Sequence, residues 1–545
     1  MLHSGAAIVL TILLMVLPLP AVAADEAANP WFQKLLSKPG LVIEDVSILA
    51  EETILDVYRD NGFRPMWNRA NVEDLMRLID ESPNHGLNPV DYGQQQLMNV
   101  LMVWLQDPSD EARARVEILL TESLLRYGYH RRLGKIKASS IDPDINFRRE
   151  AFNNQAPATT LSQALAAPSL SAFIEKLAPS GPFYRALQDW LKVYVALEES
   201  GGWGSVQSGA TLRSGDSDPR IPSIRARLAL TGDLATGANR TSTTFDRDLD
   251  NAVKSFQSRH TLDADGIIGA QTLAALNVPV QRRVEQLRAS LERLRWIRQE
   301  AVETVVAVNI AGFRANFFKD GELVWNTRAM VGKDYRQTPV FRGDIAYMEF
   351  NPTWTIPPGI LRNDTLPAIK RDPNYLTSKN IRVIDSSGRT VDPATVNWNQ
   401  YRTSVPYTLR QDPGPNNALG TVKFIFPNKH LVFLHDTPAR QLFDRPERAF
   451  SSGCIRVEDP LRLAELLLDD PAHYSRSALQ GIVDSRKTQR IRLKPNIPVV
   501  ITYLTAGLTA DGRVAFFKDI YSRDEAVLAA LNGPVRIDAP EHGGN

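Results

Sequence analysis

The chain has 545 residues, of which 43% are hydrophobic and 23% are charged, and its formal net charge is +1. This is the composition of a globular protein and excludes an intrinsically disordered chain. A charge so close to zero gives no reason to expect nucleic acid as a partner, and the length predicts several domains, because single cores stop growing near about 250–300 residues.

The N-terminus has the layout of a secretory signal peptide. An apolar run over residues 6–19 precedes Ala21-Val22-Ala23, a small-x-small cleavage pattern. The run is too short to span a bilayer comfortably, and the residues before it include His3 but no Lys or Arg, which departs from the usual pattern. We predict that residues 1–23 are a signal peptide and that the mature chain is exported; retention as a membrane anchor is the alternative.

Residues 30–205 are predicted to form a helical scaffold domain. Apolar residues recur at helical spacing in EDLMRLIDESPNHGL and in ARARVEILLTESLLRYGYHRRLGK. No constellation of acids, bases or metal ligands is evident there, so we expect a packing role.

Residues 206–280 are predicted to form a compact unit of three short helices. One helix begins at Ile221, and apolar residues at 245, 249, 252, 253 and 256 lie on one face of a second. The turn at Asp265-Gly266 leads into a third helix over 273–276, which Thr272 is expected to cap. The acidic residues of this turn lack the further ligands of a calcium loop, so no metal is expected.

This unit resembles the small three-helix peptidoglycan-binding module common in wall enzymes. Most matching positions are core and turn residues, which support the fold more than the ligand. They are Leu228, Phe245, Ala252, Phe256, Gln257, Asp265, Gly266, Gly269, Thr272, Leu273 and Leu276.

Residues 281–302 are predicted to be a linker helix. Leucines at 287, 291 and 294 join Val284 in an apolar stripe, and six arginines occupy the other faces. Because glutamates at 285, 292 and 300 are interleaved with the arginines, a solvated connecting helix is favoured over a basic patch for an acidic polymer.

The pattern changes to strands over residues 303–505. TVVAVNI alternates, RANFFKDGELVWNTRAMVG predicts a hairpin over Asp320-Gly321, KFIFPNKHLVFLHDT carries two apolar runs, and PVVITYLTA closes the region. Prolines crowd residues 351–416, which favours a functional insert over a plain loop. The predicted fold is a multidomain α+β protein whose predominantly β domain carries this insert and is followed by a C-terminal tail, 506–545.

Cys454, in the stretch FSSGCIRV, is the only cysteine. In an oxidising compartment a lone cysteine is either a small buried hydrophobe or a reactive thiol. A nucleophilic thiol needs a base, and only His430 and His435 lie shortly upstream in the same region. His435 is expected to follow a strand over 431–434 and to be held rigidly there, whereas His430, at an odd offset, should face away.

Gly453 and Arg456 extend this pattern. Glycine lets the backbone approach a ligand, so that the N–H groups at 453 and 454 can point at an oxyanion. If the segment is extended, Arg456 shares the face of Cys454, where it would lower the thiol pKa or bind a substrate carboxylate. Each residue alone has an ordinary structural explanation; together they indicate catalysis.

PNKHLVFLHDTP followed by RAFSSGCIRVEDP closely resembles the signature of L,D-transpeptidases with a YkuD-type domain: His, a small residue, Thr, then Ser-x-Gly-Cys-[Ile/Val]-Arg. Here 18 residues separate His435 from Cys454. The flanking NPTWTIPPGI, DPGPNNALG and YRDNGFRPMW are similar to the large Gram-negative members, which combine a scaffold, a peptidoglycan-binding module and a catalytic domain with a capping insert. Asp436 replaces the usual Gly, and Ser452 replaces a frequent His.

The resemblance implies acyl transfer in two steps in the periplasm. His435 takes the proton of Cys454, the thiolate attacks a donor stem tetrapeptide and expels terminal D-alanine, and the oxyanion is held near Gly453. The side-chain amine of another stem's diamino acid then forms a 3→3 cross-link. The resemblance also implies that a backbone carbonyl orients His435.

The resemblance further implies the ligands of the protein. The substrate-binding candidates are Arg456, Ser452, Thr437 and Trp354, with no cofactor and no metal. The partners are peptidoglycan stem peptides and glycan, with an inner-membrane tether if the first segment is retained, and carbapenems are expected to acylate the cysteine.

Two other functions are compatible with the same residues. A cysteine hydrolase, such as an L,D-carboxypeptidase, would use the same nucleophile and base with water as the acceptor. A non-catalytic wall-binding adaptor would use Cys454 only to link to a partner.

Overall fold

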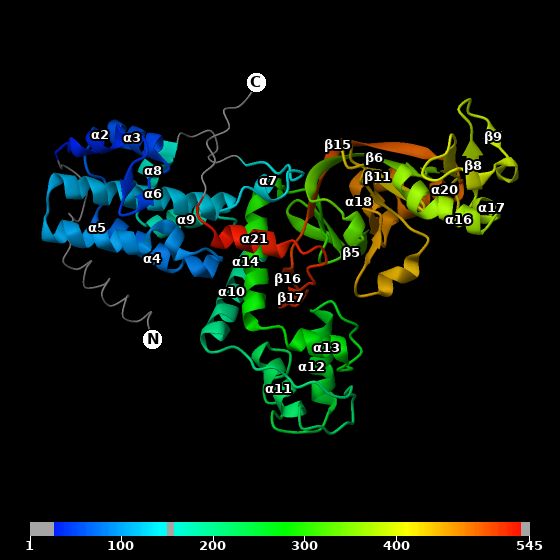
Figure 1. The fold of residues 1–545 in the computed structure, drawn as a ribbon, viewed down its shortest axis with the longest axis horizontal. Helices are drawn as coiled ribbons and strands as arrows, with labels where there is room; N and C mark the ends of the chain where they lie inside the picture. The colour runs from blue at the N-terminus through cyan, green and yellow to red at the C-terminus, as the bar shows by residue number, and fades with distance from the viewer. Residues whose placement is uncertain (1–26, 150–156, 536–545) are drawn as a thin grey trace.

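The computed structural model describes residues 27–149 and 157–535. The expected signal peptide, residues 1–23, lies outside the described residues. Figure 1 shows a helical lobe, a β-rich lobe and a smaller three-helix lobe that meet around one central helix. Within the described residues, no helix combines the length and the apolar character needed to cross a membrane.

The helical lobe packs around one long helix, α6 (Asp110–Leu133). Its core contains Trp67 and Tyr58, whose polar atoms both reach Thr121 of α6, at 2.9 and 3.1 Å. The surrounding elements are α2 (Trp31–Leu36), β1 (Val42–Ile43), β2 (Val46–Ser47), α3 (Glu51–Asp60), α4 (Arg69–Asp80), α5 (Gln94–Gln106), α7 (Ala138–Ile141), α8 (Pro157–Ala166), α9 (Leu170–Leu177) and α10 (Pro182–Glu199).

The three-helix lobe consists of α11 (Ile221–Leu230), α12 (Arg247–Ser258) and α13 (Ala270–Leu276). Gln257 joins two of the helices to the turn between them, because its side chain accepts from the N–H of Gly266 and donates to the backbone oxygen of Ile267. The expectation that Thr272 caps the third helix is wrong. That helix begins at Ala270, and the Thr272 hydroxyl instead donates to the oxygen of Ile267 at 3.0 Å.

The central helix, α14 (Val280–Trp296), is not the solvated connector that was expected. Glu292 is fully buried and accepts from the backbone N–H of Ile136 at 2.8 Å, from Arg295 at 2.9 Å and from the Trp296 indole at 3.2 Å. Arg295 also donates to the Tyr184 hydroxyl at 3.1 Å. The charges that suggested exposure are therefore paired with one another and with the scaffold inside the molecule.

The segment expected to be a C-terminal tail folds against this helix. It forms β16 (Ala506–Leu508), β17 (Val514–Phe516) and α21 (Asp524–Asn532). Arg293 of α14 pairs with Asp524, and Arg259 of the three-helix lobe donates to the oxygen of Val514 at 3.1 Å. Lys135 of the scaffold donates to the oxygen of Leu531 at 2.8 Å. This segment thus connects the helical lobe, the central helix and the three-helix lobe.

The β-rich lobe is built on a nine-stranded sheet with the order β13-β5-β14-β12-β11-β6-β15-β3-β4. An additional pairing of β4 with β5 closes all of these strands except β13 into a barrel, and β4 and β5 form the predicted hairpin. The strands are β3 (Val305–Asn309), β4 (Arg314–Lys319), β5 (Glu322–Gly332), β6 (Phe341–Phe350), β11 (Val422–Ile425), β12 (Leu434–His435), β13 (Ala449–Ser451), β14 (Ile455–Val457) and β15 (Gln489–Thr502). Helices α18 (Pro460–Leu468), α19 (Pro471–Tyr474) and α20 (Arg476–Asp484) follow β14.

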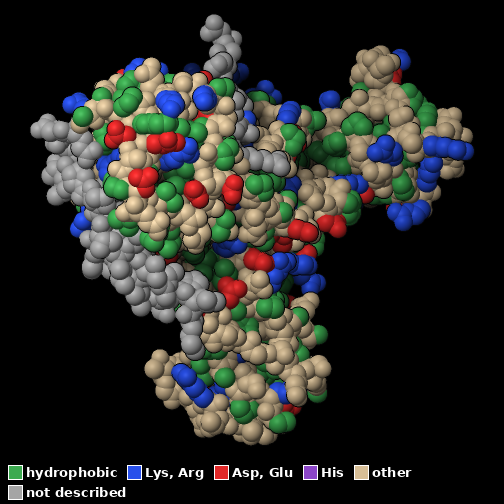
Figure 2. Space-filling view, turned by 60° about the vertical axis from the view of Figure 1, so that its left-hand side comes forward, with side chains coloured by type: hydrophobic (Ala, Val, Ile, Leu, Met, Phe, Trp, Pro, Cys, Tyr) green, Lys and Arg blue, Asp and Glu red, His purple; other side chains and the backbone are tan. Residues whose placement is uncertain are grey.

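The insert is a small folded unit rather than an irregular loop. Its sheet has the order β7-β10-β8-β9, and Leu366, Ile369 and Val383 are buried in a core of its own. Two of its prolines, Pro358 and Pro367, lie in the first turns of helices, where the missing N–H costs nothing. Figure 2 shows Lys and Arg side chains on its outer surface. The elements are β7 (Trp354–Thr355), α15 (Pro358–Ile360), α16 (Leu366–Arg371), α17 (Tyr375–Ser378), β8 (Ile381–Ile384), β9 (Thr390–Val391) and β10 (Thr408–Gln411).

The buried carboxylate of α14 yields a test of how the lobes are joined. Glu292→Leu leaves Arg295 buried without its charge partner and is expected to cost about 3–5 kcal/mol. Urea denaturation followed by tryptophan fluorescence measures the shift of the midpoint. Glu285→Ala is the matched control, because its partner Arg282 is 64% exposed and such a surface pair contributes about 0–1 kcal/mol. Equal shifts for both variants would contradict the buried-anchor assignment.

Candidate active site

The parallel pairing of β12 with β14 brings His435 and Cys454 onto one face of the sheet. The register places Leu434 opposite Ile455 and His435 opposite Arg456. Leu434 and Ile455 are fully buried in the core. Because successive side chains alternate, Cys454, His435 and Arg456 lie on the other face, with Cys454 and His435 as diagonal neighbours.

The expected strand before His435 is much shorter than predicted. Only Leu434 and His435 are in a strand, and Leu431 has a positive φ of 56°. The alternation argument for His430 is therefore wrong, because no continuous strand joins it to His435. The His430 ring lies 5.0 Å from that of Phe341, and His430 lines the cavity beside Ser452 and Gly453.

His435 is buried and is oriented by the backbone. Its Nδ1–H donates to the backbone oxygen of Asp436 at 2.5 Å, which leaves Nε2 as the acceptor. Burial lowers the pKa of His435 to about 3, and the neighbouring charge of Arg456 acts in the same direction. The Asp436 carboxylate accepts from the N–H and hydroxyl of Thr421 instead. The imidazole is thus a neutral base at neutral pH.

The thiol of Cys454 is also neutral in the resting protein. Burial raises the pKa of Cys454; a backbone hydrogen bond from Phe433 and the charges of Lys423 and Arg456 oppose this without outweighing it. The charge of Arg456 is one of those that lower the thiol pKa, and its Nε atom is buried without an acceptor among the described residues; its role at the site stays a prediction. The thiol and the imidazole are thus both neutral, and a thiolate forms only when the thiol loses its proton.

Lys423 belongs to this site and was missed from the sequence. It lies opposite His435 in the β11–β12 pairing, and its Nζ is 4.5 Å from the centre of the Phe433 ring. Burial lowers the pKa of Lys423, and Glu349 and the Cys454 thiolate oppose the shift. The alternating pattern of KFIF, which begins with Lys423, could have indicated that this side chain shares a face of the sheet with others. Which strand lies beside it depends on long-range pairing, which the sequence does not show.

The backbone around Cys454 is arranged to expose one N–H group. Ser451 Oγ donates to the oxygen of Cys454 at 2.5 Å and accepts from the N–H of Gly453 at 3.1 Å. Thr338 Oγ1 donates to the oxygen of Gly453 at 2.8 Å. Because the peptide is planar and trans, the Cys454 N–H points the opposite way, and it has no acceptor among the described residues. Gly453 itself has φ of 113°, which favours glycine.

This geometry leaves one of the two N–H groups that were expected to bind an oxyanion. The N–H of Gly453 is engaged by Ser451, so the N–H of Cys454 is the donor that remains for an oxyanion. Neither Thr338 nor Ser451 was identified from the sequence. Thr338 lies far from Cys454 along the chain, and Ser451 looks like an ordinary polar loop residue.

The remaining predicted residues occupy different places. Ser452 accepts from Arg336 at 2.8 Å, and the same guanidinium pairs with Asp364 of the insert at 2.7 Å, so the insert is tied to the cysteine loop. Thr437 is buried and accepts from the N–H of Ala439 at 3.3 Å, a turn contact. Trp354 lies in β7, packed against the insert's own core.

A cavity of about 320 Å³ opens beside the cysteine loop, with Ser452, Gly453 and His430 on one side. Asp142 and Asp144 of the scaffold and Arg523 of the C-terminal segment line it as well. This cavity is therefore built from three parts of the chain, and it borders the cysteine loop at Ser452 and Gly453 without being lined by Cys454 or His435.

Residues 303–501, which hold this site, match the L,D-transpeptidase catalytic domain family known as YkuD. The chain contains a YkuD L,D-transpeptidase catalytic domain. Residues 217–276 match a putative peptidoglycan binding domain, and residues 52–191 match a scaffold domain. The predicted family resemblance and the multidomain α+β fold are confirmed.

Two curated proteins are similar to parts of this chain. A putative L,D-transpeptidase of Haemophilus influenzae is 36% identical over 249 residues, which are 46% of this chain and 50% of that protein. The N-acetylmuramoyl-L-alanine amidase CwlM of Mycobacterium tuberculosis is 40% identical over 77 residues, 13% of this chain and 19% of that one. The chain thus spans half or less of the curated relatives it matches.

A solved structure that resembles this chain is distant in sequence. An L,D-transpeptidase from Mycobacterium smegmatis is 13% identical and covers 37% of this chain and 58% of its own, with a TM-score of 0.19.

The neutral resting pair predicts the pH dependence of the transpeptidase domain's thiol. Because burial holds the Cys454 pKa above its usual range of about 8.5, the thiolate fraction, and with it the rate of iodoacetamide alkylation, should rise with pH through neutrality without a plateau. His435→Ala should keep this profile. A plateau reached already near about pH 6 would show a preformed thiolate–imidazolium pair.

The contact from Thr338 predicts a positioning role. Thr338→Val removes the hydroxyl that holds the Gly453 peptide, so the rate of Cys454 acylation should fall on the order of tenfold to a hundredfold, somewhat less than the loss of an oxyanion donor itself. KM for the donor should change little, and Thr338→Ser should restore the rate. A valine variant with the wild-type rate, or a serine variant as slow as the valine one, would contradict the assignment.

Proposed function

We propose that this protein is an L,D-transpeptidase that forms 3→3 peptidoglycan cross-links by cysteine acyl transfer from donor stem tetrapeptides. The observation that supports this most is the neutral Cys454–His435 pair beside a free Cys454 N–H. That set supplies a nucleophile, a base and an oxyanion donor, which are the parts that acyl transfer requires.

In the first step, His435 Nε2 takes the thiol proton as Cys454 Sγ attacks the carbonyl that follows the third residue of the donor stem. The oxyanion accepts from the Cys454 N–H. The C–N bond to terminal D-alanine then breaks, and the imidazolium donates its proton to the leaving amine. A thioester on Cys454 remains, so one difficult step has been divided into two.

In the second step, the side-chain amine of an acceptor stem attacks the thioester carbonyl. His435 accepts a proton from that amine, the C–S bond breaks, and the proton returns to the thiolate of Cys454. Water competes with the amine at this stage, and its success would make the enzyme an L,D-carboxypeptidase. The link from the insert through Arg336 to Ser452 supports a role of residues 351–416 in covering the donor.

The same proposal assigns tasks to the other lobes. Residues 206–280 hold the enzyme on peptidoglycan, its substrate and partner, and residues 30–205 serve as a scaffold for both. Such a wall enzyme acts outside the cytoplasm, and we propose the periplasm. A carbapenem, whose strained lactam imitates the donor carbonyl, is proposed to acylate Cys454.

The base assignment predicts a loss of rate. His435→Ala should slow single-turnover D-alanine release about 10²–10⁴-fold, the usual effect of removing a general base. His473→Ala is the matched control, because that ring is exposed and its Nδ1 bonds only to Asp470. Mass analysis of the products separates cross-linked dimers from trimmed stems. Equal losses in the two variants would refute the role of His435.

A further inference from the structure

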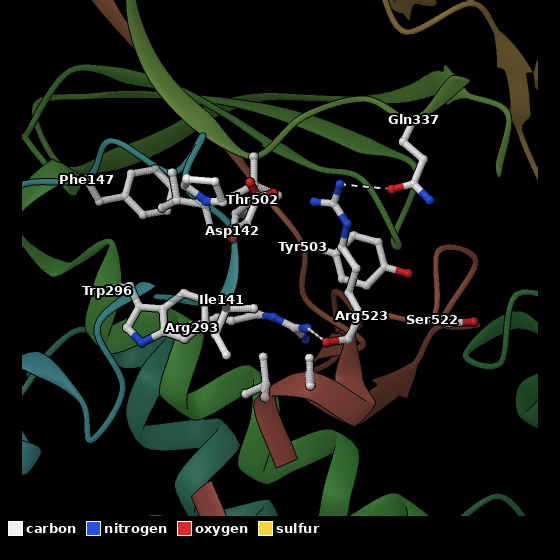
Figure 3. Close-up of a pocket in the computed structure, with 15 residues that line it drawn as sticks. Ile141, Asp142, Phe147, Arg293, Trp296, Gln337, Thr502, Tyr503, Ser522 and Arg523 are labelled. Atoms are coloured by element: carbon white, nitrogen blue, oxygen red, sulfur yellow. Dashed lines mark hydrogen bonds between the residues drawn. The ribbon is translucent and has the colours of Figure 1, made fainter. Parts of the chain in front are cut away.

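A second cavity, of about 310 Å³, adjoins the one beside the cysteine loop (Figure 3). The two share three lining residues, namely Asp142 of the scaffold, Gln337 of the β5–β6 loop and Arg523 of the C-terminal segment. The two cavities therefore meet at these three residues, and Gly453 lines the one beside the cysteine loop. Its inner part is walled by apolar side chains that include Trp296, Val340 and Phe147.

Arg523 is the cation at the junction whose charge is not neutralised. Its Nη2 donates to Gln337 Oε1 at 3.0 Å, and this is the one side-chain hydrogen bond of Arg523 among the described residues. The other arginine of the cavity, Arg293, is already paired with Asp524. Figure 3 shows Arg523 reaching up to Gln337, with Asp142 and Thr502 across the open space.

The guanidinium of Arg523 is held in place before any ligand arrives. It lies 5.6 Å from the ring centre of Tyr503 and 5.4 Å from that of Tyr521. The Tyr521 hydroxyl bonds to Gly332 and to the N–H of Thr338, the residue that holds the Gly453 peptide. A ligand bound to Arg523 would thus be positioned relative to the cysteine with little loss of freedom.

Asp142 supplies the opposite charge on the facing wall. Its Oδ1 accepts from the N–H of Asp144 at 3.0 Å, and it has no ion pair among the described residues, whereas Asp144 is paired with Lys429 at 2.7 Å. Burial lowers the pKa of Arg523, and the nearby Asp142 carboxylate opposes that shift. An arginine facing an aspartate across a small cavity is complementary to a group that carries an ammonium and a carboxylate on one carbon.

We infer that Arg523 and Asp142 form the acceptor subsite, in which Arg523 binds the carboxylate adjacent to the attacking amine of a diamino acid. This rests on the proposed function and adds to it a preference for acceptors whose amine carries an α-carboxylate. Asp142 attracts the amine as an ammonium, which releases one proton to solvent before the neutral amine attacks the thioester, and the apolar walls accommodate the methylene chain.

The test compares two acceptors, diaminopimelate and 1,5-diaminopentane, which is the same diamine without carboxylates. The full chain is first acylated on Cys454 by a donor tetrapeptide, and the rate of aminolysis is then measured with each amine by mass spectrometry. The wild type should prefer diaminopimelate on the order of tenfold to a hundredfold, the value of charge-assisted hydrogen bonds to one carboxylate. Arg523→Gln should bring the two rates to within about threefold of each other, because most of the preference is lost when the charge is removed.

Two controls make every outcome decisive. Arg389→Gln removes an arginine that is 81% exposed on the insert and should keep the full preference. Arg523→Lys keeps the charge but loses the bidentate fork, so its preference should be intermediate. An Arg523→Gln enzyme that still prefers diaminopimelate overturns the inference, as does loss of donor acylation in both Arg523 variants, which would assign Arg523 to the donor. Failure of the wild type to become acylated would refute the proposed function instead.

Discussion

The parallel register between β12 and β14 is the constraint on which the site depends. It sets Leu434 and Ile455 into the core and thereby turns His435 and Cys454 outward together. A shift by one residue would bury the imidazole and thiol positions in the barrel and expose leucine and isoleucine, which is costly. The burial of two large apolar side chains therefore determines which polar side chains meet.

In the resting site the thiol of Cys454 and the imidazole of His435 carry no charge. Desolvation keeps both the thiol and the imidazole neutral, so no ion pair has to be supported in a buried place. Lys423 and Arg456 lie close enough to stabilise a thiolate when it forms. In the proposed mechanism, electrostatic stabilisation is thus directed to the reacting state rather than to the ground state, which is the condition for accelerating a reaction.

Local sequence patterns predicted what local physics controls. The hairpin at Asp320-Gly321, the helices of the three-helix lobe and the spacing of His435, Gly453 and Cys454 follow from turn chemistry, periodicity and motif. The helix α14 was predicted, but its burial was not, because Arg293, Arg295 and Glu292 have the pattern of surface charges. Their partners Asp524 and Ile136 lie far away along the chain. Thr338 and Lys423 were not predicted as site residues for the same reason, since their positions at the site depend on which strands pair.

The central claim is that Cys454 carries the acyl group of a donor stem, and intact-mass spectrometry of the full chain tests it directly. After brief incubation with a donor tetrapeptide, the account predicts a mass gain equal to the donor's acyl group without its terminal D-alanine. Peptide mapping should place that gain on Cys454, and it should be absent from Cys454→Ala. D-alanine release with no covalent adduct in the wild type, or an adduct on any other residue, would contradict the account.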